Sequence, residues 1–317
     1  MRSVTKLAIA FATFACGRTL PDSGELVGTF QQPVGAIAGD DAAMYGLGAD
    51  LERIPLSGGP AVVLASGLDG FDLLVTGSSV LWYEEVDKTV VSLPKTGGPP
   101  RVLASSQYDL AALQSDGTNL YWSTNEYLTA TEPWTIRSMP LGGGQVTELL
   151  NITGAAISAM VVDDKRIYYL TENRGGTVPQ TGPYGIQSIP KDGSSPPVML
   201  HPSSGFSVGG LWRLGTGLFW GEGGELRRMD LGTGEISTFA RLTTGGGSIG
   251  IIMDAGGAFR FVQECGDKHS GCWTWLRTVP GEADRAYVHG FASAAALDER
   301  FVYWVVGNAR ELRRVRR

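Results

Sequence analysis

The feature that most constrains this chain is an internal repeat that occurs seven times. In six copies a short apolar segment ends in Asp or Gly, and in one it ends in Leu; an aromatic residue follows five positions later inside a second apolar segment. The seven pairs are Asp40 with Tyr45, Gly77 with Trp82, Asp116 with Tyr121, Asp163 with Tyr168, Leu214 with Phe219, Asp254 with Phe259, and Asp298 with Tyr303. Successive aromatic residues lie 37, 39, 47, 51, 40 and 44 positions apart. Helical spacing of apolar residues is not seen, so the repeat predicts a unit of short strands.

Six of the seven copies continue into a third segment with a turn-like ending, clearly Pro- and Gly-rich in four of them, such as LPKTGG at 93–98 and MPLGGG at 139–144, and weaker in the other two. Pro removes a backbone donor at a strand end and Gly allows positive φ, so these endings predict turns into a fourth strand. Repeats of roughly 40 to 50 residues with four strands are typical of β-propeller blades. The sequence therefore predicts an all-β, seven-bladed β-propeller with four-stranded antiparallel blades.

The seventh copy is one strand short. Its third strand spans Glu311 to Val315, and the sequence ends two residues later. An unpaired third strand would leave an open sheet edge. The segment Glu25 to Gln32 has the composition of a strand, and we expect it to pair antiparallel with 311–315, so that an N-terminal strand closes the last blade.

Residues 1–16 have the layout of a secretory signal peptide, with Arg2 and Lys6 before an apolar run that ends at Cys16. The run is too short to span a membrane. It fits a lipoprotein signal, in which Cys16 is acylated, and also ordinary cleavage after Ala15. We expect a short linker at 17–24, a single propeller at 25–317, and an exported protein that is periplasmic or lipid-anchored to the cell envelope.

The strings LYW (120–122), IYY (167–169), LFW (218–220) and VYW (302–304) resemble exported bacterial propellers of the TolB-like and YWTD-like type. The resemblance covers 25–317 and implies the fold, since blade-core motifs do not specify function. The Thr-Asp that follows Tyr-Trp in lipoprotein-receptor propellers is missing here, so receptor function is not implied. Similar proteins are chiefly lipoproteins of undetermined function.

The charge balance argues against a nucleic-acid partner. The formal net charge is -6, whereas nucleic-acid binding depends on clustered Lys and Arg. The basic end at 310–317 alternates apolar and charged residues, as a strand with one solvated face does. No later segment has 18 consecutive apolar residues, so we expect contact with a membrane only through a lipid on Cys16. We also expect a monomer.

Length variation is concentrated in three hairpins between second and third strands, at 123–135, 171–185 and 264–272. Binding residues tend to lie on variable loops of a rigid scaffold. Aromatic rings beside carboxylates and an Arg can bind a sugar or a peptide by stacking and hydrogen bonds. The alternative is that these side chains are ordinary solvent-exposed loop residues without a ligand. The candidate ligand-binding residues here are Glu126, Tyr127, Trp134, Glu172, Asn173, Arg174 and Tyr184.

The third hairpin contains Cys265 and Cys272. In an exported chain two Cys flanking a hairpin tip are expected to form a disulfide. The alternative is a zinc site in which Asp267 and His269 join both thiolates, although the spacing differs from that of common zinc modules.

The expected innermost strands are mostly apolar. Apart from the Asp residues that end them, only Gln114 and Arg213 are strongly polar, and we include both as candidate ligand-binding residues. Because the Asp residues recur at one repeat position, they are better explained as turn caps than as a unique active site. A carboxylate ring that binds calcium is the alternative; otherwise we expect no cofactor and no metal.

Two functions remain open. We favour a noncatalytic cell-envelope binding or scaffold protein that presents its hairpin-decorated face to a protein or carbohydrate ligand. The alternative is an exported hydrolase or lyase that acts on a carbohydrate or a small cyclic ester at the mouth of the propeller channel, near Gln114 and Arg213. Catalytic motifs such as Gly-x-Ser-x-Gly, phosphate loops and His-Glu-x-x-His do not occur in the sequence.

Overall fold

The protein is described from a computed structural model. The described residues are 9–10, 24–108, 110–125, 133–172, 184–202, 208–241, 247–254, 257–265, 272–279, 284–289, 292–306 and 308–317. Within these ranges the regular structure is entirely β-strand, and no helix there is long and apolar enough to cross a membrane. The chain divides into two compact units, which we describe separately.

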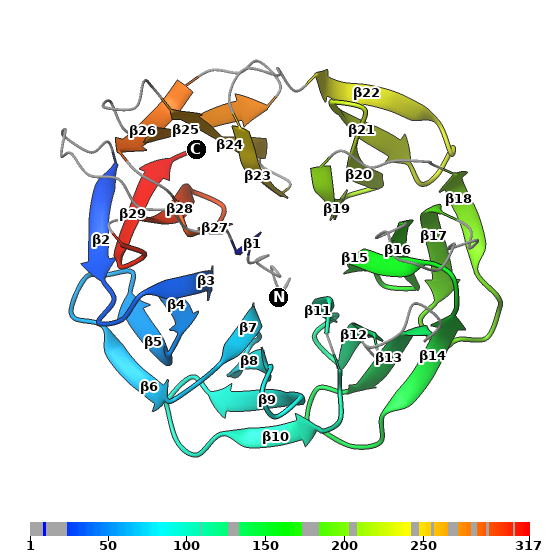
Figure 1. Cartoon of the computed structure of the whole chain (residues 1–317), viewed down its shortest axis with the longest axis horizontal. Helices are drawn as coiled ribbons and strands as arrows, with labels where there is room; N and C mark the ends of the chain where they lie inside the picture. Colours follow the sequence, from blue (N-terminus) through cyan, green and yellow to red (C-terminus); the bar gives the residue numbers. More distant parts are fainter. Residues whose placement is uncertain are drawn as a thin grey trace. The chain divides into compact units, whose positions relative to one another are not determined.

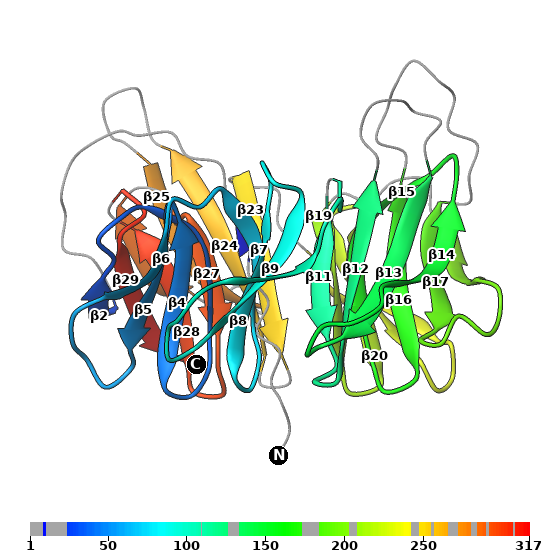
Figure 2. The ribbon, with the colours of Figure 1, turned by 90° about the horizontal axis from the view of Figure 1, so that it is seen from below.

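Unit 1 comprises 85–92 and 101–242 and contains three four-stranded sheets. Blade 3 is formed by β11 (Ala112–Ser115), β12 (Asn119–Asn125), β13 (Trp134–Pro140) and β14 (Thr147–Ile152). Blade 4 is formed by β15 (Ala156–Val162), β16 (Arg166–Glu172), β17 (Gly185–Pro190) and β18 (Val198–Pro202). Blade 5 is formed by β19 (Val208–Leu214), β20 (Gly217–Glu222), β21 (Glu225–Asp230) and β22 (Ile236–Arg241). Figure 2 shows the strands of blades 3 and 4 standing roughly parallel to one another.

Unit 2 comprises 2–84, 93–100 and 243–317. Blade 1 is formed by β3 (Val34–Gly39), β4 (Ala43–Gly48), β5 (Asp50–Pro55) and β6 (Val62–Ser66). Blade 6 is formed by β23 (Gly247–Asp254), β24 (Gly257–Cys265), β25 (Cys272–Val279) and β26 (Asp284–His289). The division between the units falls within blade 2, which is formed by β7 (Gly70–Val75), β8 (Ser79–Glu84), β9 (Thr89–Pro94) and β10 (Arg101–Ala104).

The remaining sheet of unit 2, the closing sheet, has five strands and corrects our prediction. Its order is β1 (Ile9–Ala10), β27 (Ala294–Leu297), β28 (Phe301–Val306), β29 (Glu311–Arg316) and β2 (Glu25–Thr29). The structure therefore has six four-stranded blades, and the prediction of seven is wrong. The physical reason is that the edge of β27 is not free, because Ile9 and Ala10 pair with Ala295 and Ala294. The sequence places these two apolar residues in the predicted signal peptide, and their pattern does not predict a strand.

The pairing of the N-terminal strand with the last third strand is confirmed. β2 runs antiparallel to β29, with Glu25 opposite Arg314 and Thr29 opposite Glu311. Arg314 also forms an ion pair with Glu25 at 2.9 Å. The strand ends before Gln32, because the amides of Gln31 and Gln32 donate to the buried carboxylate of Glu52 and turn the chain.

Neighbouring innermost strands lie side by side within each unit. In unit 2 they follow the order β23, β27, β3 and β7 (Figure 1), and in unit 1 the order β11, β15 and β19. A repeated aromatic on the second strand fills the core: Trp82, Trp122, Tyr169, Trp220 and Trp304 are almost completely buried. Each of these aromatic side chains removes a large apolar area from water, which is the main favourable contribution to folding.

The recurring Asp residues cap turns, as predicted. Oδ1 of Asp116 accepts hydrogen bonds from the amides of Thr118 and Asn119, both at 2.8 Å. Asp40, Asp163 and Asp298 accept equivalent bonds.

The register in blade 2 differs by one residue from our prediction. Thr76, and not Gly77, donates its amide to the turn carbonyl as Asp116 does, and its hydroxyl oxygen accepts from Ser79 N at 3.2 Å. A hydroxyl thus replaces the capping carboxylate in this blade. Because Thr76 is neither acidic nor small, the repeat pattern places the end of the strand at the adjacent Gly77.

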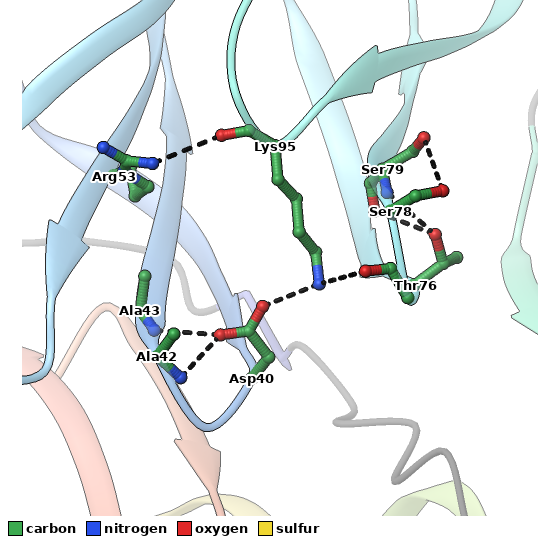
Figure 3. A network of polar contacts seen from close by, with 9 residues as sticks. Asp40, Ala42, Ala43, Arg53, Thr76, Ser78, Ser79 and Lys95 are labelled. Carbon is green, nitrogen blue, oxygen red and sulfur yellow. Dashed lines mark hydrogen bonds and ion pairs between the residues drawn. The ribbon is translucent and has the colours of Figure 1, made fainter. Parts of the chain in front are cut away.

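Three of these Asp residues also join adjacent blades. Lys95, at the end of the third strand of blade 2, lies 2.6 Å from Asp40 of blade 1 (Figure 3). Lys191 and Arg317 occupy the matching position after their third strands and bind Asp116 and Asp254 in the same way. We call these three ion pairs the interblade pairs.

Candidate functional site

The hairpins between second and third strands differ greatly in length, as predicted. In blade 5 the hairpin is closed by Glu222 opposite Glu225, and in blade 1 by Leu47 opposite Leu51. In blade 3 the last pair is Asn125 with Trp134, and in blade 4 it is Thr171 with Gly185. The strands extend further into the long hairpins than the sequence indicated, so the hairpin bases are part of the sheets.

Buried polar groups hold the hairpin base of blade 4. Thr171 donates its hydroxyl to the carbonyl of Gly185 at 3.1 Å, and its Oγ1 accepts from Nε2 of Gln187 at 3.0 Å. Oε1 of Gln187 in turn accepts from the hydroxyl of Tyr169 at 3.2 Å. Burial raises the pKa of Tyr169 above its ordinary value, so this hydroxyl stays a donor. Fully bonded networks of this kind restrict a buried site to one conformation.

The hairpin base of blade 3 is built in a similar way. The hydroxyls of Thr124 and Thr135 lie 2.8 Å apart across β12 and β13, and both side chains are buried. A single apolar cluster joins this base to blade 4, with Trp134, Ile157 and Tyr169 among its members. The bases of the two long hairpins are therefore packed together.

The structure locates only some of the predicted ligand-binding residues. Trp134 is buried in that cluster, whereas Glu172 and Tyr184 are half-buried at the base of the blade 4 hairpin. Glu126, Tyr127, Asn173 and Arg174 lie outside the described residues. These assignments stay predictions.

The two polar residues predicted on innermost strands both lie in unit 1. Gln114 is half-buried on β11. Arg213, on β19, is about one third exposed, and its Nε lies 3.3 Å from Oδ2 of Asp163 in blade 4. Arg213 thus supplies Asp163 with the cation that Lys95 and Lys191 supply elsewhere, although it comes from a different strand.

A polar cluster around His201, beside the blade 4 hairpin, is not predicted by the sequence. His201 lies opposite Ile186 at the start of β17, and its Nε2 is 3.0 Å from Oε2 of Glu222 in blade 5. The same carboxylate accepts from Nε1 of Trp220 at 3.3 Å and lies 3.6 Å from Nε of Arg227. The sequence does not predict this cluster, because no sequence pattern links residues on three strands of two blades.

The cysteine assignments remain predictions. The backbone register places Cys265 directly opposite Cys272, at the last pair of β24 and β25. Directly opposite Cα atoms lie about 4.5–5.5 Å apart, within the range that a disulfide spans. Asp267, His269 and Cys16 lie outside the described residues. Across the described ranges, no group of three His, Cys, Asp or Glu is placed to hold a metal ion.

Comparison with known proteins supports the fold. No family model matches the sequence. No curated protein matches it closely enough to count as a relative. An oligogalacturonate lyase from Vibrio parahaemolyticus has a TM-score of 0.64 at 11% identity, and covers 98% of this chain and 97% of its own. A manganese complex of oligogalacturonate lyase gives 0.62 at 11% identity, with 96% and 98% covered. A chain of a nidogen/laminin complex gives 0.52 at 12% identity, with 78% and 93% covered.

These similarities and the blade architecture define the class: the chain is a β-propeller. At this identity they show the fold alone, because one fold hosts many functions. The propeller part of the predicted resemblance is therefore confirmed, whereas sequence families give no support for TolB-like or lipoprotein status.

Proposed function

We propose that this chain is an exported binding or scaffold protein of the cell envelope that presents the long hairpins of blades 3 and 4 to a protein or carbohydrate ligand. One observation carries the proposal. Two adjacent blades bear long hairpins, and both hairpin bases are fixed by buried hydrogen bonds above a shared apolar cluster. A rigid base lowers the entropy lost when a loop orders on a ligand, which is how scaffold-borne loops gain affinity.

Export is the second part of the proposal. The basic start, apolar run and Cys16 support a leader, with acylation or ordinary cleavage as alternatives. An oxidising compartment would also allow Cys265 and Cys272 to form a disulfide across their hairpin. Mass spectrometry of protein isolated from the native envelope tests the acyl group and the thiol state together.

Shortening the blade 4 hairpin tests the binding site. Residues 173–183 are replaced by Asn-Gly, a sequence suited to a two-residue hairpin turn, so that Thr171 and Gln187 are kept. We expect loss of binding to glycan arrays or to identified envelope proteins, with little change in unfolding temperature.

A matched control changes a hairpin of the same unit without shortening it. Gly223 and Gly224 of blade 5 have φ of 60° and 78°, and Asn-Gly fits this turn. The Gly223→Asn variant should bind as the wild type does. Unchanged binding by the shortened variant would overturn the proposed site.

A hydrolase or lyase acting on a carbohydrate or small cyclic ester is the second candidate. Its support is the similarity in fold to two structures of oligogalacturonate lyase over nearly the whole chain, together with Gln114 and Arg213 on innermost strands. An activity screen on oligogalacturonate and lactones, with Arg213→Ala as a variant, tests it. Turnover that depends on Arg213 but not on residues 173–183 would replace the binding proposal with the enzymatic one.

A further inference from the structure

One position on the innermost strands differs in a single sheet. It is the third residue before the one that pairs with the second residue of the second strand. Six sheets have Ala or Gly there, and blade 2 has Asp72. The six small residues are Ala36, Ala112, Ala159, Gly210, Gly250 and Ala294. In five of these sheets the small residue pairs with the fifth residue of the second strand, whereas in blade 2 Phe71 makes that pair and Asp72 lies in the irregularity that follows it.

The backbone at Asp72 is strained. Its φ is 56°, in the left-handed region that non-glycine residues seldom adopt, and the pairing of β7 with β8 is irregular between Phe71 and Leu74. Bulges of this kind redirect a side chain, and strained residues tend to cluster at functional sites. β7 is also the last strand of its sheet, so no described strand pairs with the edge of β7 that faces away from β8.

Among the described residues, none supplies a counter-charge to the carboxyl group of Asp72. Its Oδ2 is buried and has no hydrogen-bond partner in the described part of the chain, while the residue keeps part of its surface exposed. Burial raises the pKa of Asp72 to about 7. The strands packed most extensively against β7 are β3, β4 and β8, and their ionisable residues are Tyr45, Tyr83 and Glu84. None of these is a cation.

We propose that Asp72 anchors a ligand-binding site on β7, and that the ligand carries a positively charged nitrogen, as an ammonium or guanidinium group does. A buried carboxylate without a partner destabilises the fold, and a cation with N–H donors supplies both the charge and the hydrogen bonds that this group lacks. Residues kept at a cost in stability are commonly those that function requires.

Carbon-13 NMR of the Asp72 carboxyl group tests this in the full-length protein. Methylguanidinium and methylammonium are the probes, and acetamide is the neutral comparison. We expect saturable binding of the cations that moves the Asp72 titration from near pH 7 towards pH 4. Affinity should be roughly tenfold or more weaker at pH 5.5 than at pH 8, because binding requires the ionised carboxylate.

Three variants complete the test. Asp72→Asn should abolish cation binding, and Asp72→Gly, which restores the residue type of Gly210, should do so in a protein that folds at least as well. Asp69→Asn, at an exposed carboxylate of the same blade, should leave binding unchanged. Equal binding of acetamide, or an Asp72 titration that no cation shifts, would overturn the proposal.

Discussion

Asp116 and Asp72 are both aspartates in four-stranded blades, but their surroundings differ: Asp116 is surrounded by hydrogen-bond donors, whereas burial alone acts on Asp72. Burial acts to raise the pKa of Asp116, but hydrogen bonds from Lys191, from the amides of Asn119 and Thr118, and from Tyr121 outweigh it and lower this pKa to about 2. No described group offsets burial at Asp72, whose pKa rises to about 7. The comparison shows that burial alone does not decide whether a carboxylate stabilises this protein. The hydrogen-bond donors and cations around the carboxylate decide it.

The largest expected effect is the pH dependence that Asp72 imposes. Its folded-state pKa lies above its unfolded-state value, so the stability it contributes is present below pH 4 and is lost as the pH rises through 7. The difference in unfolding free energy between wild type and Asp72→Asn should change by on the order of 4 kcal/mol across this window. Urea unfolding at pH 4, 6 and 8 measures it. Parallel stability curves for the two proteins would show that Asp72 has its ordinary pKa.

The next largest effect is the loss of stability expected when the buried, hydrogen-bonded side chain of Gln187 is removed. Gln187→Ala removes the partner of both Thr171 and Tyr169 in the hairpin base. Losing both hydrogen bonds, and leaving the buried hydroxyl of Tyr169 without the acceptor on Gln187, should cost about 2–3 kcal/mol in unfolding free energy. Gln145, which is exposed, is the control, and Gln145→Ala should change stability by less than about 0.5 kcal/mol. A similar small loss in both variants would contradict the network.

Asp116 should show a pH dependence of the opposite sign. Its folded-state pKa is depressed, so its contribution is present above pH 4 and is lost as the pH falls towards 2. Asp116→Asn keeps the turn-capping oxygen but loses the charge, and should cost about 2 kcal/mol at pH 7 and little at pH 2. Thermal unfolding between pH 2 and 7 checks this, with Asp164→Asn at an exposed site as the control. A loss that is equal at both pH values would rule out the ion pair with Lys191 as its cause.

The smallest effect is expected at the hairpin base of blade 3. Thr124→Val or Thr135→Val alone leaves one buried hydroxyl without its partner and should cost about 1 kcal/mol. The double variant removes both hydroxyls and should be nearly as stable as the wild type. A double-mutant cycle in urea measures the coupling. Strictly additive losses would mean that the two hydroxyls do not interact.

Much of the fold follows from local pattern. The repeat spacing identified every second strand, and the Pro- and Gly-rich endings identified the turns after the third strands, because turn chemistry and apolar alternation act between near neighbours. The capping role of Asp116 and its equivalents was predictable for the same reason, since the bonded amides are two and three residues away. The partner of each Asp was not predictable. Lys95 lies 55 residues from Asp40, and Lys191 lies 75 residues from Asp116.

The candidate sites divide in the same way. Hairpin length can be counted in the sequence, so the sequence predicts the long hairpins of blades 3 and 4. The buried network of Thr171, Gln187 and Tyr169 depends on which faces of β16 and β17 meet, and the sequence around it reads as ordinary strand. The FDLLV segment at 71–75 likewise reads as an apolar strand, and nothing in it reveals the positive φ of Asp72.

The sequence by itself determined the all-β class, the blade repeat and the pairing of the N-terminal strand with the last third strand, since these depend on periodicity and on a missing strand. Only the tertiary structure decided the fifth strand of the closing sheet, the interblade pairs and the isolation of Asp72. Those features arise where segments distant in sequence meet, and there burial and the presence or absence of a partner set the free energy of each polar group.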